Sequence, residues 1–260
     1  MTEPGGRTAA DRLLAVLAAF DHAHAALTLT DVSRRAGLTL PTAHRLVGML
    51  TAWGALERDA SGAYRIGLRL LELAALAPRG LVLREAAMPF LEDLFEATHE
   101  NVQLAVRDAA EVVYVERIAG RSAVGVKTQV GARWPLHATG VGLVLLAHSP
   151  AGFQDGYLAG PLASFTDHTV TDPQRLRRML AEVRHSGCAV SERQITDDAL
   201  SVAAPVRGPH GDVVASVSVV VHAAGARPNA LIPALRVAGA GISRALGWQP
   251  PWQPPTGASA

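Results

Sequence analysis

The sequence is poor in the features that mark secreted and membrane proteins. It contains one cysteine, Cys188, among 260 residues, which excludes an internal disulfide framework. No apolar run approaches the roughly 18 residues that a membrane span requires. The stretch from Met1 to Ala10 lacks an apolar segment followed by a cleavage site, so we expect no signal peptide. These absences predict a cytoplasmic protein.

Charge is also scarce, and it is unevenly distributed. The formal net charge is +1 and Lys127 is the only lysine, so the overall charge does not by itself indicate a nucleic-acid-binding protein. Hydrophobic residues make up 49% of the chain, which is ample for a buried core. Between residues 30 and 69, arginines outnumber acidic residues: Arg34, Arg35, Arg45, Arg58, Arg65 and Arg69 against Asp31, Glu57 and Asp59.

The N-terminal third has the pattern of three helices followed by a hairpin. Apolar spacing predicts a helix over 12–20, and a loop or short extended piece follows over 22–29. Thr30 is the expected N-cap of a second helix over 31–36, and Gly37 is its expected end. Thr39 is the expected cap of a third helix that runs to about Trp53. Two short strands, 55–58 and 63–66, flank a turn, and this order is typical of a winged helix-turn-helix.

The remainder predicts a separate domain of mixed helices and strands. We expect helices over 68–77, 81–98, 137–147, 173–185 and 228–246, and strands over 102–106, 112–118, 123–129, 188–191, 201–206 and 213–221. Strands interleaved with helices in this way favour an α+β domain around one sheet. The segment 249–260 is rich in Pro, Gly and Ser and is expected to be disordered.

Several stretches, taken in order, resemble the IclR family of bacterial transcription regulators. The resemblance rests on 29–38, 41–46, 64–70, 135–142, 186–192 and 201–219, and it spans roughly residues 8–246. It implies a winged helix-turn-helix domain over 8–70, a linker helix over 71–84 and a GAF-like effector-binding domain over 85–248. Family members bind operator DNA as homodimers or homotetramers, respond to a small molecule, and repress or activate catabolic operons.

The third helix is the expected DNA-recognition helix. Its first turns offer Thr39, Thr42, His44 and Arg45 to base edges in the major groove, since arginine contacts guanine and threonine contacts phosphate or a thymine methyl. Arg34 on the preceding helix, and Arg58 and Arg65 on the hairpin, are expected to contact DNA, chiefly at phosphates. The alternative for each is a solvated surface residue or a structural ion pair. One winged-helix domain makes few contacts, so a dimer is expected on physical grounds as well.

The family's effector site carries over to a set of residues on strands and at a helix start. Exposed N–H groups at the N-terminus of the helix after Thr139 would bind a carboxylate, and serines on strands would add hydrogen bonds. The alternative is that these serines bond to their own backbone and that the valines are core residues. A serine stands at position 191, where some relatives have an acid, so we expect a less polar pocket that suits an aromatic or larger carboxylate. The implied residues are Val126, Trp134, Gly140, Val141, Ser191, Ala199, Ser201, Ser218 and Val220.

No pattern indicates a metal site, a cofactor or catalysis. His22 and His24 lie close together, but no cysteine or carboxylate completes a recognised metal spacing. A lone cysteine on a predicted strand is more often buried than reactive. Adjacent acids at Asp197 and Asp198 are expected in a polar loop. We therefore predict a regulator without metal, cofactor or catalytic residues. The second hypothesis is an enzyme acting on a small acid, with the winged helix as a docking module.

Overall fold

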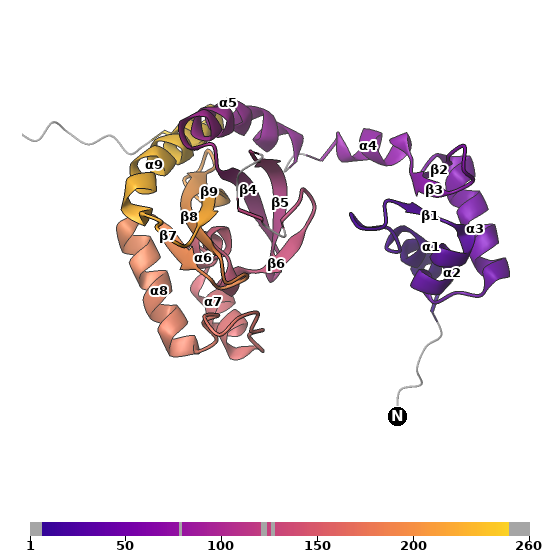
Figure 1. Cartoon of the computed structure of the whole chain (residues 1–260), viewed down its shortest axis with the longest axis horizontal. Coiled ribbons are helices and arrows are strands. Elements are labelled where there is room, and N and C mark those ends of the chain that lie inside the picture. The colour runs from indigo at the N-terminus through magenta and orange to yellow at the C-terminus, as the bar shows by residue number, and fades with distance from the viewer. Residues whose placement is uncertain (1–6, 78–79, 121–123, 126–127, 250–260) are drawn as a thin grey trace, which may run out of the picture. The chain divides into compact units, whose positions relative to one another are not determined.

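The computed structural model describes residues 7–77, 80–120, 124–125 and 128–249 (Figure 1). The chain divides into two compact units, Met1–Leu81 and Val82–Ala260. The linker expected over 71–84 spans this boundary: it contains the end of α4 (Leu68–Ala74) and the start of α5 (Leu81–Thr98).

The first unit is a winged helix-turn-helix, as the sequence predicted. Three helices, α1 (Ala9–Leu17), α2 (Leu29–Ala36) and α3 (Leu40–Trp53), pack on one another around a small sheet. The sheet has the order β1-β3-β2 and consists of β1 (Ala26–Leu27), β2 (Leu56–Arg58) and β3 (Tyr64–Ile66), all antiparallel. Val16, Val32, Leu46, Leu50 and Leu56 belong to its core.

The helix ends follow the capping residues, with one correction. Thr28, not Thr30, is the N-cap of α2: its hydroxyl accepts from the Asp31 N–H at 3.2 Å and donates to the Asp31 carboxylate at 2.7 Å. The prediction of Thr30 was wrong because two threonines lie within reach of the helix start, and only Thr28 has the extended backbone that a cap needs. Gly37, at φ 64°, ends α2 in the left-handed conformation, as expected.

The second unit is built on a six-stranded antiparallel sheet of order β6-β5-β4-β9-β8-β7, which confirms the α+β fold. Its strands are β4 (Asn101–Asp108), β5 (Glu111–Ile118), β6 (Arg133–Pro135), β7 (Ala189–Glu192), β8 (Ala199–Arg207) and β9 (Val213–His222). Its helices after α5 are α6 (Gly140–Ala147), α7 (Ala151–Ala159), α8 (Pro173–Ser186) and α9 (Pro228–Ala245), and a short 3-10 turn, η1 (Leu136–Ala138), precedes α6.

The two faces of this sheet are covered by different helices. On one face, Leu91 of α5 and Leu235 of α9 belong to a core with Val202 and Val219 of the sheet. On the other face, Val144 of α6 and Leu180 of α8 belong to a second core. The candidate effector residues on β7, β8 and β9 lie on this second face, because side chains alternate along each strand.

Three predictions for this unit differ from the structure. The strand expected over 123–129 is wrong where the chain is described: residues 124–125 and 128–129 form no strand, and β6 takes the sheet edge. The helix expected over 137–147 is interrupted at Thr139, whose extended backbone separates η1 from α6. The helix α7 was missed, since its sequence carries little amphipathic pattern. The tail expected to be disordered lies, beyond Gln249, outside the described residues.

Candidate functional site

Helix α3 presents the side chains expected to contact DNA on its exposed face. Ala43, Leu46, Val47 and Leu50 are buried, so the helix is fixed along one side. His44 and Arg45 are exposed and Thr42 is half-buried. The Thr39 hydroxyl donates to that of Thr42 at 2.9 Å, which ties the helix start together. The exposed face is not only polar, because Leu40, Met49 and Trp53 are each about half exposed.

Arg45 differs from the other candidate arginines in its partners. Its only hydrogen bond within the described part of the chain is to the sulfur of Met49, at 3.7 Å. Arg34 is paired with Asp31 at 2.9 Å, and Arg65 with Asp59 at 2.9 Å. Hydrogen bonds from Ser61 and Arg65 lower the pKa of Asp59 to about 2, so this wing pair remains charged.

Arg58 is held within the wing as well. Its Nε donates to the carbonyl of Gly62 at 3.1 Å, and its guanidinium lies 5.7 Å from the centre of the Tyr64 ring. The wing arginines are thus fixed by the hairpin, whereas Arg45 is free of carboxylate partners among the described residues. Of this set, Arg45 is the side chain best able to give up its bound water and contact a DNA base.

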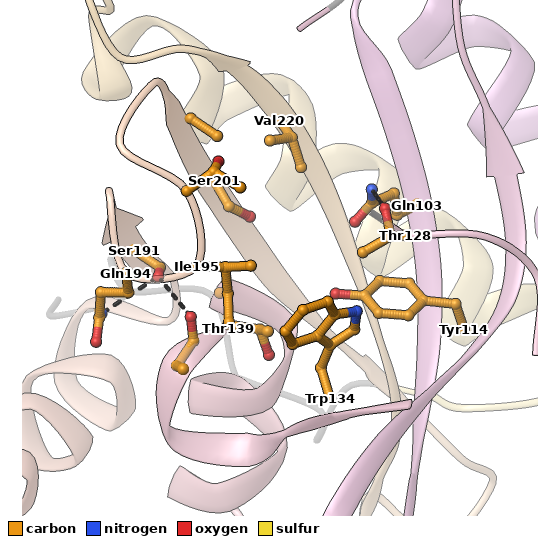
Figure 2. Close-up of a pocket in the computed structure, with 14 residues that line it drawn as sticks. Gln103, Tyr114, Thr128, Trp134, Thr139, Ser191, Gln194, Ile195, Ser201 and Val220 are labelled. Atoms are coloured by element: carbon orange, nitrogen blue, oxygen red, sulfur yellow. Dashed lines mark hydrogen bonds between the residues drawn. The ribbon is translucent and has the colours of Figure 1, made fainter. Parts of the chain in front are cut away.

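The second unit contains a cavity between the sheet and the start of α6. Figure 2 shows side chains from strands, from the start of α6 and from the loop after β7 converging on this space. The predicted effector residues that line it are Trp134, Gly140, Ser191, Ala199, Ser201 and Val220.

Three other predicted effector residues do not belong to the described lining. Val141 is buried in the core beneath α6. Ser218 is fully buried on β9, opposite Gln103 in register, and its hydroxyl has no hydrogen-bond partner among the described residues. Val126 lies outside the described residues. The structure therefore brings together the residues at the strand ends and the helix start.

The start of α6 reaches the cavity because two positions there are glycine. A Cβ on Gly140 would lie 2.6 Å from the Ser201 hydroxyl, so only glycine lets the helix end approach β8 this closely. The Thr139 hydroxyl caps α6 by accepting from the Gly142 N–H at 3.0 Å. The N–H groups of Gly140 and Val141 are in the first turn, where no intrahelical acceptor exists.

The sequence reading missed several lining residues, most of them neutral and polar. Gln103 had a usable signal, because it is a polar residue inside the apolar run of β4; its amide donates to the Thr128 hydroxyl. Tyr114 shares the buried face of β5 with Val112 and Glu116, and burial raises the pKa of its hydroxyl above the ordinary value. The other missed residues are Thr128, Ala138, Thr139, Gln194, Ile195 and Thr196, and the loop members carried no signal.

Gln194 fixes the loop after β7 over the cavity. Its Nε2 donates to the Ser191 hydroxyl at 3.2 Å, and its Oε1 accepts from the Val170 N–H at 3.1 Å (Figure 2 draws the first bond). Its backbone carbonyl accepts from the Thr169 hydroxyl at 2.7 Å. A buried amide with these partners holds the loop in one position.

The described lining of the cavity contains no charged side chain. Its walls are aromatic and aliphatic, from Trp134, Tyr114, Ile195 and Val220, and its polar groups are hydroxyls and amides. Phe165 packs edge-on against Trp134, with ring centres 5.4 Å apart. Such a cavity suits a flat, weakly polar molecule better than a highly charged one.

Neither a metal site nor a membrane-spanning helix occurs in the part of the chain that the structure describes. No group of three or more histidine, cysteine or acidic residues there is arranged to hold a metal ion. Within that same part, none of the helices combines the length and apolar character needed to cross a membrane. His24, considered for a metal, is paired with Asp21 at 2.8 Å.

Comparison with known proteins agrees with both units. Residues 9–60 match the family model described as the IclR helix-turn-helix domain, and residues 77–244 match the model described as bacterial transcriptional regulator IclR C-terminal. The chain is 34% identical over 194 residues to the HTH-type transcriptional regulator KipR of Bacillus subtilis, covering 74% of this chain and 78% of that protein. It is 30% identical over 243 residues to XynR of Escherichia coli, covering 92% and 96%.

Solved structures also match this chain to the IclR family. An IclR homolog from Microbacterium hydrocarbonoxydans, solved in complex with 4-hydroxybenzoate, superposes with a TM-score of 0.87 at 36% identity, covering 92% of this chain and 99% of that chain. These matches join the chain to regulators and not to enzymes, so the hypothesis of a small-acid enzyme is dropped. The chain belongs to the IclR family: it is a DNA-binding transcription regulator with a winged helix-turn-helix domain and a C-terminal effector domain.

Proposed function

We propose that this regulator controls a metabolic operon in response to a small aromatic monocarboxylate bound in the cavity between α6 and the sheet. The observation that carries the proposal is the lining of that cavity, which combines Trp134 and Tyr114 with neutral polar groups and no charged described side chain. The bound 4-hydroxybenzoate of the Microbacterium relative supports the same class of ligand.

The chemistry of the cavity accounts for one carboxylate and one ring. The first-turn N–H groups of Gly140 and Val141, at the positive end of the α6 dipole, would receive the carboxylate. Trp134 and Val220 would cover the ring. A second carboxylate would meet no arginine or lysine among the described lining residues, and burying an unpaired charge is strongly unfavourable.

A melting experiment with 4-hydroxybenzoate, benzoate and succinate tests this proposal. A ligand at 100 times its dissociation constant stabilises the folded state by about 2.7 kcal/mol, which raises the melting temperature by roughly 5–10 °C in a chain of this size. We expect a shift with the aromatic acids and none with succinate. Trp134→Ala should remove most of the shift, and Trp53→Ala on α3 should leave it unchanged. A larger shift with succinate would reject the aromatic assignment.

We also propose that α3 reads the operator, with Thr39, Thr42, His44 and Arg45 near base edges. Arg34, Arg58 and Arg65 would lie against phosphates. DNA from upstream of the regulated gene should bind with an affinity that falls steeply as salt rises, because phosphate contacts release counterions. Adding the effector should change that affinity only to the extent that the effector binds one conformation better than the other.

The proposed DNA-binding form is a homodimer. In a single chain Leu68, Leu71 and Leu76 in and after α4 are each at least 61% exposed, which leaves an apolar face for a second copy. Two winged helices a whole turn of DNA apart would supply the contacts that one lacks. Sedimentation should give a dimer, and Leu71→Lys should weaken it, whereas Leu14→Lys on α1 should not. A monomer at micromolar concentration would reject this assembly.

A further inference from the structure

A second cavity, distinct from the effector cavity, lies where β8, α9 and the turn after α8 meet. None of its lining residues lines the effector cavity. The lining residues that matter chemically are Arg207 of β8, Arg236 and Ser243 of α9, and Trp248 just beyond α9. Gly187, at the C-terminal end of α8, adds no side chain to the wall.

The two arginines make this cavity positively charged. Neither Arg207 nor Arg236 has a carboxylate within ion-pair distance among the described residues. Each is held instead by a backbone carbonyl: Arg207 Nη1 donates to Gly211 O at 2.8 Å, and Arg236 Nη2 donates to Ser186 O at 2.5 Å. A guanidinium has five N–H donors, so each keeps most of them for another acceptor.

Further positive charge lies close by. Burial lowers the pKa of His148, and the charges of Arg207 and Arg184 lower it further, which places both guanidinium groups within electrostatic reach of one imidazole. Arg184 too is held by neutral groups, the carbonyl oxygen of Ala147 at 3.1 Å and the side-chain amide oxygen of Gln154 at 3.4 Å. An anion entering the cavity would therefore offset charge that the described residues leave uncompensated.

The walls of the cavity are fixed before any anion arrives. The Arg207 backbone N–H donates to the Ser243 hydroxyl at 2.8 Å, and that hydroxyl donates to the Gly239 carbonyl at 2.5 Å. The Arg207 guanidinium lies 6.0 Å from the centre of the Trp248 ring. Preorganised, planar guanidinium groups are the side chains best suited to paired hydrogen bonds with an oxyanion.

We propose that this basic cavity binds the oxyanion group, phosphate or carboxylate, of a small metabolite. Arg207 and Arg236 hold the oxyanion, and the Trp248 indole offers a flat surface for the rest of the molecule. The site is separate from the effector cavity and does not depend on the identity of the effector.

Calorimetric titration of the full chain at constant ionic strength tests the proposal. The probes are inorganic phosphate in one arm and malonate in the other, so that the two oxyanion classes are distinguished. Arg207→Gln and Arg236→Gln should each weaken binding about tenfold or more, the loss expected for one charge-assisted contact. Arg244→Gln, an exposed charge on the same helix outside the cavity lining, is the matched control and should change the affinity less than twofold.

Three outcomes would overturn the proposal. The first is that neither probe binds at concentrations up to roughly 10 mM, which is about ten times the upper end of ordinary metabolite levels. The second is an equal loss in Arg236→Gln and Arg244→Gln, which would reveal a general charge effect. The third is a loss of probe binding in Trp134→Ala, a substitution in the lining of the effector cavity, which would put the probe in the effector cavity. Melting curves of all variants establish that each is folded, and Arg236→Lys should recover part of the affinity.

Discussion

Helices α3 and α6 show two opposite ways of using a helix in a regulator. Every residue of α6 is buried, and the helix meets the cavity only at its first turn. Helix α3 buries four residues along one side and exposes most of the others. A helix that must be read by another molecule needs an exposed face, whereas a helix that senses a small molecule needs only an accessible end.

The glycines of these helices reflect the same difference, and replacing them with alanine has the largest expected effect on stability. A Cβ on Gly142 would lie 2.2 Å from the Leu136 carbonyl oxygen, but a Cβ on Gly48 of α3 would meet nothing within 4 Å. Gly142→Ala should therefore destabilise folding by about 3 kcal/mol through overpacking. Gly48→Ala should stabilise by about 0.5–1 kcal/mol, because alanine favours helix. Chemical unfolding measures the change in unfolding free energy for both variants. Equal changes would contradict the difference between the two helices.

Substitution of Arg45 tests whether the exposed face of α3 contacts DNA. Arg45→Ala removes a side chain without a carboxylate partner among the described residues, so the folded state should lose little. Specific DNA binding should weaken by about 1–3 kcal/mol if Arg45 contacts a base. Fluorescence anisotropy at fixed salt measures this loss, and the effector-induced melting shift is the control. Unchanged affinity for the operator would remove Arg45 from the recognition surface.

Helix α2 packs against α3, and the cap at the start of α2 allows a test with a smaller expected effect on stability. Thr28→Ala should destabilise the first unit by about 1 kcal/mol, since it removes the hydroxyl that accepts from the Asp31 N–H. Thr30→Ala, two residues on and inside the helix, should change stability by less than about 0.5 kcal/mol. If urea unfolding gave the larger effect for Thr30, the cap assigned by the structure would be wrong.

The smallest expected effect is a pH dependence on the α6 side. His137 Nε2 donates to the Ala163 carbonyl at 2.9 Å, so Nδ1 of the neutral ring accepts from the Tyr157 hydroxyl at 2.8 Å. Burial lowers the pKa of His137 below 6.5. The unfolded chain then binds more protons, so stability present above pH 6.5 is lost as the pH falls below it. His137→Gln should flatten this slope in unfolding experiments between pH 7 and 5; an unchanged slope would assign it elsewhere.

The comparison also explains which features the sequence could predict. The first unit was predicted almost completely, because apolar spacing, Gly37, Gly54 and the wing turn are local signals. The error at Thr28 arose where two similar residues competed for one cap. Gly140 was predicted to line the effector cavity because the family resemblance covers it, although the helix itself was expected to begin at residue 137.

The rest of the effector cavity could not be predicted, because it depends on contacts between distant segments. Gln194 lines the cavity only because Thr169 and Val170 hold its loop, and nothing local to Gln194 indicates those partners. Ser218 and Ser201 are both serines on central strands, and their side chains point to the same face of the sheet, yet only Ser201 reaches the cavity. Helix α7 was missed because its own residues show little amphipathic pattern.

The complete burial of α6 has a consequence in time. Amide protons of a helix with no exposed residue exchange with solvent only when the surrounding domain opens, so α6 should be among the slowest-exchanging segments of the chain. A ligand that binds the closed domain makes each opening rarer in proportion to its occupancy. The amide protons of α6 would then exchange more slowly with effector than without it. Hydrogen exchange would therefore report effector binding at a helix whose residues are all buried in the folded state.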